Sequence, residues 1–258
     1  MKKRDTIKSY WYESTDPNHS TNWGDAINPY LIKKISGLEV SRDANGPGRL
    51  FAAGSILDHG LKDGDILWGT GSITNHRIKP NLNIDIRAVR GPLTRNNLIN
   101  SGYKCPDVYG DPALLVKEYY DPEIDITHHV GIIPHITERN HPALLDLINR
   151  TGIKLIDIGL GHTEFIDVVK SVKLILSSSL HGLIVADAYG IPNSRITISD
   201  KLTGGDFKFI DYFMSVDRKL YRPNHIELGA DLNNLIKGSH FNNKIKIDLE
   251  RLKQSFPF

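Results

Sequence analysis

The sequence predicts an α/β protein built from two doubly wound halves. Short apolar runs that favour strands alternate with stretches in which apolar residues recur at helical spacing. The alternation occurs in two series, and a polar segment that contains Pro122 lies between them. Strands that alternate with helices form parallel sheets covered on both faces, and a length of 258 residues is enough for two such sheets.

The first series supplies four strands and two helices. We expect strands at 6–12, 49–55, 65–72 and 84–90. We expect a helix at 25–37 that Gly37 closes, and a helix at 91–102 in which Pro92 suits the first turn and Gly102 the C-terminal cap.

The second series begins near residue 128. We expect strands at 129–135, 153–159 and 172–178, and helices at 141–152, 163–171 and 180–190. The acidic segment 114–129 is the expected linker, which gives domains at 1–120 and 121–258 and allows the C-terminal helix to pack back on the first. Doubly wound sheets bind ligands at the carboxyl ends of their strands, so the chemistry is expected in the loops that follow the strands and face a crevice between the halves.

Composition excludes several classes of protein. Lys and Arg number 32 against 30 acidic residues, and no basic block is longer than Lys2 to Arg4, so the chain is not expected to bind nucleic acid. Cys105 is the single cysteine, which excludes an intramolecular disulfide and fits a small buried thiol in a reducing compartment. No secretory leader and no apolar run of about 18 residues is visible. We therefore expect a cytoplasmic protein, at most peripheral to the inner membrane face.

The stretch SSSLHG, residues 177–182, joins a predicted strand to an apolar helix. Unpaired N–H groups at a helix N-terminus, with serine hydroxyls beside them, can bind a phosphate or a carboxylate. His181 would then be a general acid or base next to the bound anion. In the alternative interpretation, the serines cap the helix and His181 packs beneath it.

Three arginines surround the end of the strand predicted at 84–90. Strand alternation places Arg87 and Arg90 on opposite faces, and Arg90, next to Gly91, is the one expected to enter the crevice and grip an anion. For Arg87 and Arg95 the alternative is a solvated surface charge.

Other polar residues also lie at predicted strand ends. Gly24 would allow a ligand to approach and Asp25 would bind a sugar hydroxyl, or these two and Asn22 simply cap a helix. Asp111 either caps the next turn or orients a basic group across the crevice. His135 ends an apolar strand and is expected to face the crevice.

Cofactor motifs are not apparent. The spacing of His135, Glu138 and His141 does not suit zinc, and no H-E-x-x-H motif occurs. The segment GTGSIT (69–74) lacks the third glycine of a dinucleotide fingerprint, and no phosphate-binding P-loop occurs. We expect neither a metal nor a cofactor.

Seven short blocks resemble those of one enzyme family, in the same order. They are NWGDAINPYL, WGTGS, RAVRGPLTR, YGDPALL, IIPH, SSSLHGLIVADAYGIP and DFKFIDYF, and they are similar to blocks of the polysaccharide pyruvyl transferases, above all of the xanthan-type branch. The resemblance runs from about residue 20 to residue 215, with an echo at 247–258. It implies a GT-B-like fold, with two Rossmann-like halves, a cleft between them and no metal. It also implies transfer of the enolpyruvyl group of phosphoenolpyruvate to two hydroxyls of a hexose, which forms a pyruvate ketal and releases phosphate.

The resemblance also implies roles for individual residues. His181 matches the histidine of a Leu-His motif implicated as the acid/base group, and Arg90 matches a donor-binding arginine. Several relatives carry an arginine where this chain has Ser179, so backbone amides and another arginine must take over part of the anion binding. His135 is the second candidate for proton transfer. The expected donor-binding residues are Ser177, Ser178, Ser179, Leu180, Gly182 and Arg87, and the expected acceptor-binding or structural residues are Asn22, Gly24, Asp25, Asp111, Lys208 and Asp211.

The expected partners are phosphoenolpyruvate and a saccharide acceptor, which we take to be lipid-linked. Two alternatives stay open. One is a GT-B glycosyltransferase that uses a nucleotide sugar, which needs an acidic residue for the ribose. The other is a non-catalytic saccharide-binding protein that stacks sugars on Trp11, Trp23 and Trp68.

Overall fold

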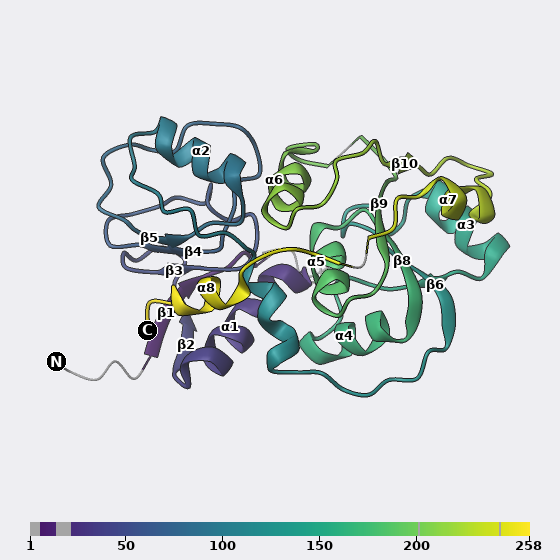
Figure 1. The fold of residues 1–258 in the computed structure, drawn as a ribbon, viewed down its shortest axis with the longest axis horizontal. Coiled ribbons are helices and arrows are strands. Elements are labelled where there is room, and N and C mark those ends of the chain that lie inside the picture. Colours follow the sequence, from purple (N-terminus) through teal and green to yellow (C-terminus); the bar gives the residue numbers. More distant parts are fainter. Residues whose placement is uncertain (1–5, 14–21, 201, 243) are drawn as a thin grey trace. The chain divides into compact units, whose positions relative to one another are not determined.

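The computed structural model describes residues 6–13, 22–200, 202–242 and 244–258. The chain forms two compact units, and each is built around a parallel five-stranded sheet (Figure 1). Unit 1 comprises Met1–Tyr119, Thr203–Lys219 and Lys246–Phe258, and unit 2 comprises Tyr120–Leu202 and Leu220–Ile245. The mixed α/β class with two parallel sheets, predicted from the sequence, is confirmed.

The sheet of unit 1 has the strand order β2-β1-β3-β4-β5. Its strands are β1 (Thr6–Tyr10), β2 (Glu39–Arg42), β3 (Leu50–Phe51), β4 (Ile66–Trp68) and β5 (Asp85–Ala88). Successive side chains enter different cores: Leu50 packs in one cluster with Ile32, and Phe51 packs in another with Leu98. The sheet is therefore buried on both faces, as a doubly wound arrangement requires.

The helices of unit 1 follow their sequence signals. They are α1 (Trp23–Ser36), α2 (Pro92–Asn100), the 3-10 helix η1 (Pro112–Glu118), α6 (Phe207–Ser215) and α8 (Leu249–Gln254). Gly37 closes α1 with a φ of 71°, and Pro92 is the first residue of α2. Gly102 lies one residue beyond the capping Ser101 and has a φ of 92°.

The predicted linker at 114–129 begins too early. Leu114, Leu115 and Val116 belong to η1 and are buried, and Leu115 shares a hydrophobic core with Leu252 of α8. The polar composition of 117–129 hides this short apolar run, which is held in unit 1 by burial of its side chains.

The sheet of unit 2 has the strand order β10-β9-β8-β6-β7. Its strands are β6 (His128–Ile133), β7 (Lys154–Leu155), β8 (Val172–Ser177), β9 (Asn193–Thr197) and β10 (Asn224–His225). Parallel pairing sets Ile133 of β6 opposite Ser177 of β8, and Ser177 opposite Arg195 of β9. The loops that follow these strands therefore leave the sheet at one edge.

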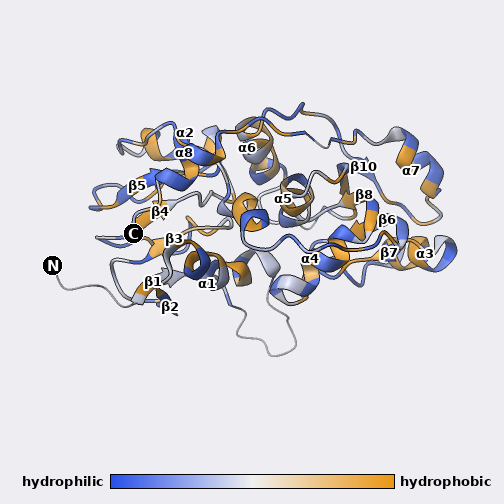
Figure 2. Ribbon diagram, turned by 60° about the horizontal axis from the view of Figure 1, so that its bottom comes forward, coloured by the Kyte–Doolittle hydropathy of each residue, from blue (hydrophilic) through white to orange (hydrophobic). Residues whose placement is uncertain are grey.

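The helices of unit 2 differ in how much of their surface is buried. They are α3 (Pro142–Thr151), α4 (His162–Lys170), α5 (Leu180–Ala188) and α7 (Leu232–Gly238). Both hydrophilic and hydrophobic residues colour α3 and α7 in Figure 2, as expected for helices with one face in water. By contrast, every residue of α5 from Leu180 to Asp187 is buried. None of the helices in the described part of the chain has the length and apolar character to span a bilayer.

Candidate active site

In unit 1, polar loops meet at the carboxyl ends of β3, β4 and β5. Thr70 Oγ1 donates a hydrogen bond to Gly54 O at 3.1 Å, and Gly71 N donates to the same carbonyl at 3.0 Å. Arg90 N, two residues after β5, donates to Thr70 O at 3.0 Å. These bonds bring the three loops together at the sheet edge where doubly wound proteins bind ligands.

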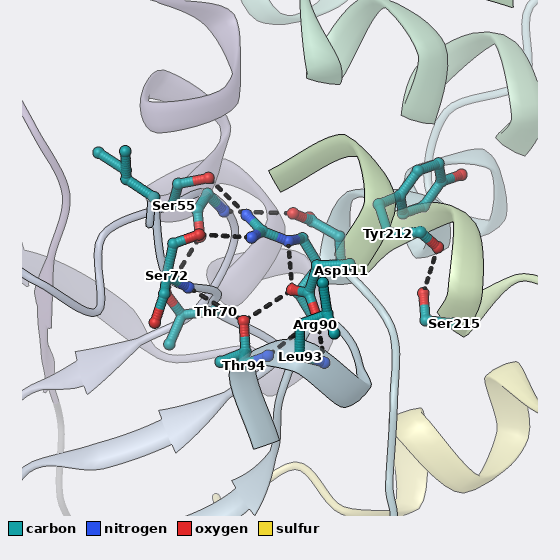
Figure 3. A network of polar contacts seen from close by, with 12 residues as sticks. Ser55, Thr70, Ser72, Arg90, Leu93, Thr94, Asp111, Tyr212 and Ser215 are labelled. Atoms are coloured by element: carbon teal, nitrogen blue, oxygen red, sulfur yellow. Dashed lines mark hydrogen bonds and ion pairs between the residues drawn. The ribbon is translucent and has the colours of Figure 1, made fainter. Parts of the chain in front are cut away.

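Arg90 is completely buried among these loops. Its Nε donates to Asp211 at 3.0 Å, its Nη2 donates to Ser72 O at 2.6 Å, and its Nη1 donates to Ser55 Oγ (Figure 3). A guanidinium group carries five N–H donors, so two of them have no acceptor among the described residues. The buried hydroxyl of Ser72 also has no hydrogen-bond partner there.

Asp211 of α6 is the partner of Arg90 and is equally buried. Its carboxylate accepts hydrogen bonds from Leu93 N at 2.9 Å, from Thr94 N at 3.0 Å and from Thr94 Oγ1 at 2.6 Å. Asp211 thus caps the N-terminus of α2 from a distant part of the chain and neutralises Arg90. Of its two predicted roles, acceptor binding and structure, these contacts supply the structural one.

Two glycines allow the backbone to approach this pair. A Cβ atom on Gly71 would lie 2.2 Å from Cζ of Arg90, and one on Gly91 would lie 2.1 Å from the carbonyl oxygen of Asp211. Any larger residue at either position would have to displace the ion pair or the backbone around it.

The other predicted residues of unit 1 lie around this network. Asn22 caps α1 by accepting from Gly24 N at 3.1 Å, while Gly24 is buried and Asp25 half-buried in the first turn. Asp111 caps η1 and also accepts from Gly54 N at 3.3 Å. These contacts agree with the capping interpretation of Asn22 and Asp111.

Arg87 and Lys208 do not join the buried network. Arg87 is exposed on β5, where it pairs with Asp85 at 2.8 Å, whereas Arg90, expected to enter a crevice, is completely buried. Lys208 of α6 lies over the ring of Phe209, with its Nζ 5.4 Å from the centroid.

In unit 2, Ser177 is the last residue of β8, and Ser178 and Ser179 form the turn that leads to α5. Ser177 Oγ lies 2.9 Å from both Ile133 O and Ser179 O, either of which can accept its proton. It also accepts a hydrogen bond from Ser179 N at 3.0 Å. Ser179 is the N-cap residue of α5, but its side chain makes no capping hydrogen bond. The first N–H groups of α5 therefore have no capping hydroxyl from this residue, so the alternative interpretation, in which the serines cap the helix, does not hold for Ser179.

His181 lies in the first turn of α5 and is 7% exposed, between Leu180 and Gly182, which are also buried. A Cβ atom on Gly182 would lie 2.4 Å from Ser177 Oγ and 2.9 Å from a methyl carbon of Ile133. Glycine at this position therefore lets the helix that carries His181 lie directly on the ends of β6 and β8.

Glu138 is a buried residue for which no sequence motif predicted a functional role. It is 2% exposed, and it accepts from Ser178 Oγ at 2.6 Å, from Ser199 Oγ at 2.7 Å and from Ser199 N at 3.0 Å. Ser178 Oγ in turn accepts from His135 N at 2.9 Å. The carboxylate thus ties together the loops after β6, β8 and β9. The sequence does contain a signal for this contact, because a serine follows each of the two neighbouring strands: Ser178 after β8 and Ser199 after β9.

His135 is half-buried in the same set of loops. Its Nδ1 lies 2.8 Å from Thr137 Oγ1, and its carbonyl accepts from Glu138 N at 2.8 Å. Within the described residues, no group of three His, Cys, Asp or Glu side chains is arranged to hold a metal ion.

The predicted tryptophan platforms are wrong. Trp11 is 7% exposed, and Trp23 and Trp68 are completely buried. All three pack in unit 1, where a sugar ring cannot stack on them.

The geometry thus defines a class of protein: two parallel α/β units, each with hydrogen-bonded polar loops at the carboxyl ends of its strands. Comparison with known sequences identifies the family. A family model described as polysaccharide pyruvyl transferase matches residues 66–200, slightly more than half of the 258 residues. The chain belongs to the polysaccharide pyruvyl transferase family, whose members are enzymes that transfer a pyruvyl group to a polysaccharide. The matched segment contains Arg90, His135 and the stretch Ser177 to Gly182.

Two individual relatives are similar over most of the chain. A succinoglycan biosynthesis protein of Rhizobium meliloti, ExoV, is 27% identical over 251 residues, which cover 91% of this chain and 72% of that protein. An uncharacterized protein of Acanthamoeba polyphaga mimivirus is 29% identical over 217 residues, which cover 78% of this chain and 74% of that protein.

Proposed function

We propose that this enzyme takes the enolpyruvyl group from phosphoenolpyruvate and joins it to two hydroxyls of one hexose as a cyclic pyruvate ketal, with release of phosphate. The acceptor is an exopolysaccharide or its lipid-linked precursor. The observation that carries the proposal is the turn from Ser177 to Gly182, which sets His181 in the first turn of a buried helix at the carboxyl edge of a parallel sheet. Family membership favours this reaction over glycosyl transfer from a nucleotide sugar.

The proton chemistry assigns the central role to His181. As an imidazolium, it protonates the methylene carbon of phosphoenolpyruvate, which leaves a cationic centre at C2. A sugar hydroxyl adds to C2 and loses its proton. The C2–O bond to phosphate then breaks, and phosphate leaves with the electron pair. The second hydroxyl of the same sugar closes the ring, and its proton returns to the neutral imidazole of His181. His135, the second histidine at this sheet edge, is the alternative proton donor.

Anion binding in unit 2 is assigned to backbone amides rather than to serine hydroxyls. The hydroxyls of Ser177 and Ser178 are already engaged with Ile133 O and Glu138. The first N–H groups of α5, near Leu180 and Gly182, carry the positive end of the helix dipole and suit a phosphate or carboxylate oxygen. Ser177 and Ser178 then serve to hold the turn in place.

Arg90 is the proposed donor-binding cation of unit 1. Its two N–H groups without an acceptor and the buried Ser72 hydroxyl suit a carboxylate. Because all of these groups are sealed from solvent, direct contact requires the loops at Ser55 and Ser72 to move apart. The proposal keeps Arg87 as an outer donor contact, and Asn22, Gly24, Asp25, Asp111 and Lys208 as candidates on the acceptor side.

The rest of the proposal follows the family resemblance. It includes a GT-B-like fold with domains near 1–120 and 121–258, and a reaction without metal or cofactor. It also places the enzyme in the cytoplasm, at most peripheral to the inner membrane face, where a lipid-linked acceptor would be found.

The test is to incubate the enzyme with phosphoenolpyruvate and candidate oligosaccharides while phosphate release and product mass are followed. Phosphoenolpyruvate-dependent mass on the sugar, reduced by about 10²- to 10⁴-fold in His181→Ala, is the expected result. Turnover that survives in His181→Ala and disappears in His135→Ala would transfer the acid role to His135. If calorimetry shows no phosphoenolpyruvate binding and no acceptor is modified, the donor assignment is wrong.

A further inference from the structure

The proposed reaction needs a second group that His181 does not supply. While His181 gives a proton to the donor, the attacking sugar hydroxyl must lose one, and the group that takes it must be reachable by a ligand. Arg90 and Asp211 are sealed inside unit 1, so neither can play this part. The inference below rests on the proposed function.

A carboxylate–imidazole pair lies beside the Arg90 network. Asp58, in the loop after β3, and His76, in the loop after β4, approach with Oδ1 and Nε2 3.0 Å apart. The other carboxylate oxygen of Asp58 accepts from Ile73 N at 2.8 Å, which fixes its orientation. The side chain of His76 is 36% exposed and that of Asp58 is 20% exposed. A substrate can therefore reach this pair without opening the core.

Nδ1, the second ring nitrogen of His76, has a hydrogen-bond partner whether the imidazole is neutral or charged. Nδ1 lies 3.1 Å from Thr74 Oγ1 and 3.3 Å from Thr74 O. When Nε2–H donates to Asp58 and the ring is neutral, Nδ1 accepts a hydroxyl proton; when the ring is charged, Nδ1–H can donate to the carbonyl. A hydroxyl, an imidazole and a carboxylate in line are the arrangement that activates an oxygen nucleophile.

The pair is also tied to the proposed donor site within unit 1. Arg90 binds Ser55 and the carbonyl of Ser72, and the loops that carry these residues continue to Asp58 and to Ile73, respectively. Burial raises the pKa of Asp58, while the hydrogen bond from Ile73 N and the positive charge of Arg90 oppose this rise. Asp58 thus lies within the electrostatic reach of the arginine.

We propose that His76 is the base that accepts the proton of the attacking sugar hydroxyl, and that Asp58 is the positioning residue that orients it. The O–H bond breaks as the oxygen forms its bond to the cationic C2, and the proton moves to Nδ1 of His76. The resulting imidazolium is stabilised by Asp58 and later releases the proton to water. The sugar hydroxyl takes the place that the Thr74 hydroxyl occupies in this structure.

The chain offers a matched control. His225 has its Nδ1 3.1 Å from Thr197 Oγ1, the same contact that His76 makes with Thr74. Among the described residues, no carboxylate pairs with His225, and it is exposed on β10. Loss of a histidine–threonine contact alone can thus be separated from loss of the Asp58–His76 pair.

The experiment compares His76→Asn, Asp58→Asn, the double variant and His225→Asn, each checked by thermal unfolding. We expect kcat of His76→Asn to fall by about 10²- to 10³-fold, while the Kd for phosphoenolpyruvate, measured by calorimetry, changes by less than about twofold. The kcat of Asp58→Asn should fall less than that of His76→Asn, and the kcat of the double variant should fall no further than that of His76→Asn. The kcat of His225→Asn should match that of the wild type. Added imidazole should restore part of the turnover of His76→Gly.

Three results would overturn the inference. The first is a kcat for His76→Asn within about threefold of the wild type, and the second is equal losses in His76→Asn and His225→Asn. The third is a loss in His76→Asn that comes entirely from weaker phosphoenolpyruvate binding. If the wild type itself does not transfer from phosphoenolpyruvate, the proposed function fails and this inference fails with it. If the wild type transfers the group and His76→Asn does so at the same rate, only the inference about His76 is rejected.

Discussion

Replacement of Asp211 by alanine should destabilise unit 1 strongly and leave the rest of the chain folded. The side chain belongs to α6, yet it holds the N-terminus of α2 and the guanidinium of Arg90, which is fully buried. Asp211→Ala removes the only carboxylate that pairs with Arg90 among the described residues.

The magnitude follows from two contributions. An unpaired buried charge costs about 3–5 kcal/mol of folding free energy, and loss of a helix cap costs about 1 kcal/mol. Together they amount to about 4–6 kcal/mol, a large part of the roughly 5–15 kcal/mol that stabilises a typical domain. With a urea dependence of about 2 kcal/mol per molar, the unfolding midpoint of unit 1 should fall by about 2–3 M.

Tryptophan fluorescence can follow unit 1 alone. All three tryptophans of the chain, Trp11, Trp23 and Trp68, belong to unit 1 and are buried there. Excitation at wavelengths that tyrosine does not absorb therefore reports the urea unfolding of this unit without a signal from unit 2.

Two further variants decide the cause of the loss. Asp217→Asn removes a carboxylate whose ion pair with Lys246 is exposed, and it should leave the midpoint near that of the wild type. Arg90→Met combined with Asp211→Leu leaves no unpaired charge and should regain part of the loss. If Asp211→Ala shifts the midpoint no more than Asp217→Asn does, the reasoning about the buried pair is refuted.

Three smaller predictions test other parts of the fold. Gly182→Ala should cost roughly 1–3 kcal/mol in thermal unfolding because its Cβ atom would meet Ser177 Oγ at 2.4 Å, whereas Gly161→Ala should be nearly neutral; equal effects would contradict the close packing of α5. Burial raises the pKa of the Cys105 thiol to about 12, so Ellman's reagent should label it at pH 8 only after unfolding, and rapid labelling of the native enzyme would show that the thiol is accessible. Burial lowers the pKa of His59 below 6.5, so the folded state favours the neutral ring. The contribution of the neutral ring to folding stability is therefore present above pH 6.5 and is lost as the pH falls through the lower folded-state pKa. His59→Gln should therefore flatten the fall of the unit 1 urea midpoint between about pH 7 and 5, and an unchanged slope would count against the burial of this ring.

The elements that could be predicted from sequence are those with strong local signals. Strand β8, expected at 172–178, occupies Val172–Ser177, because a strand buried in a parallel sheet is a continuous apolar run. The edge strand β2 was missed, since three of its four residues are exposed and show no apolar pattern. No local signal indicates that Thr203–Lys219 returns to unit 1 from the middle of the second half.

The positions of the candidate residues along the strands and loops were predictable, but their contacts were much less so. Polar residues after the strands of parallel sheets could be located from turn signals alone, as Arg90 and Ser178 were. The partner of Arg90 is 121 positions away along the chain, and only the folded structure shows that Asp211 fills the space beneath Gly91. The contacts of Glu138 were likewise not predictable, because its two serine partners lie in the loops after two different strands.

Exposure separates the structural groups of unit 1 from those that can perform chemistry. Arg90 and Asp211 are both completely buried, and both oxygens of the carboxylate are hydrogen-bonded, so this pair connects α2, α6 and two loops. Asp58 and His76 lie on those same loops but remain open to water. The buried pair connects the loops, and the exposed pair that they carry is the one that we propose for proton transfer.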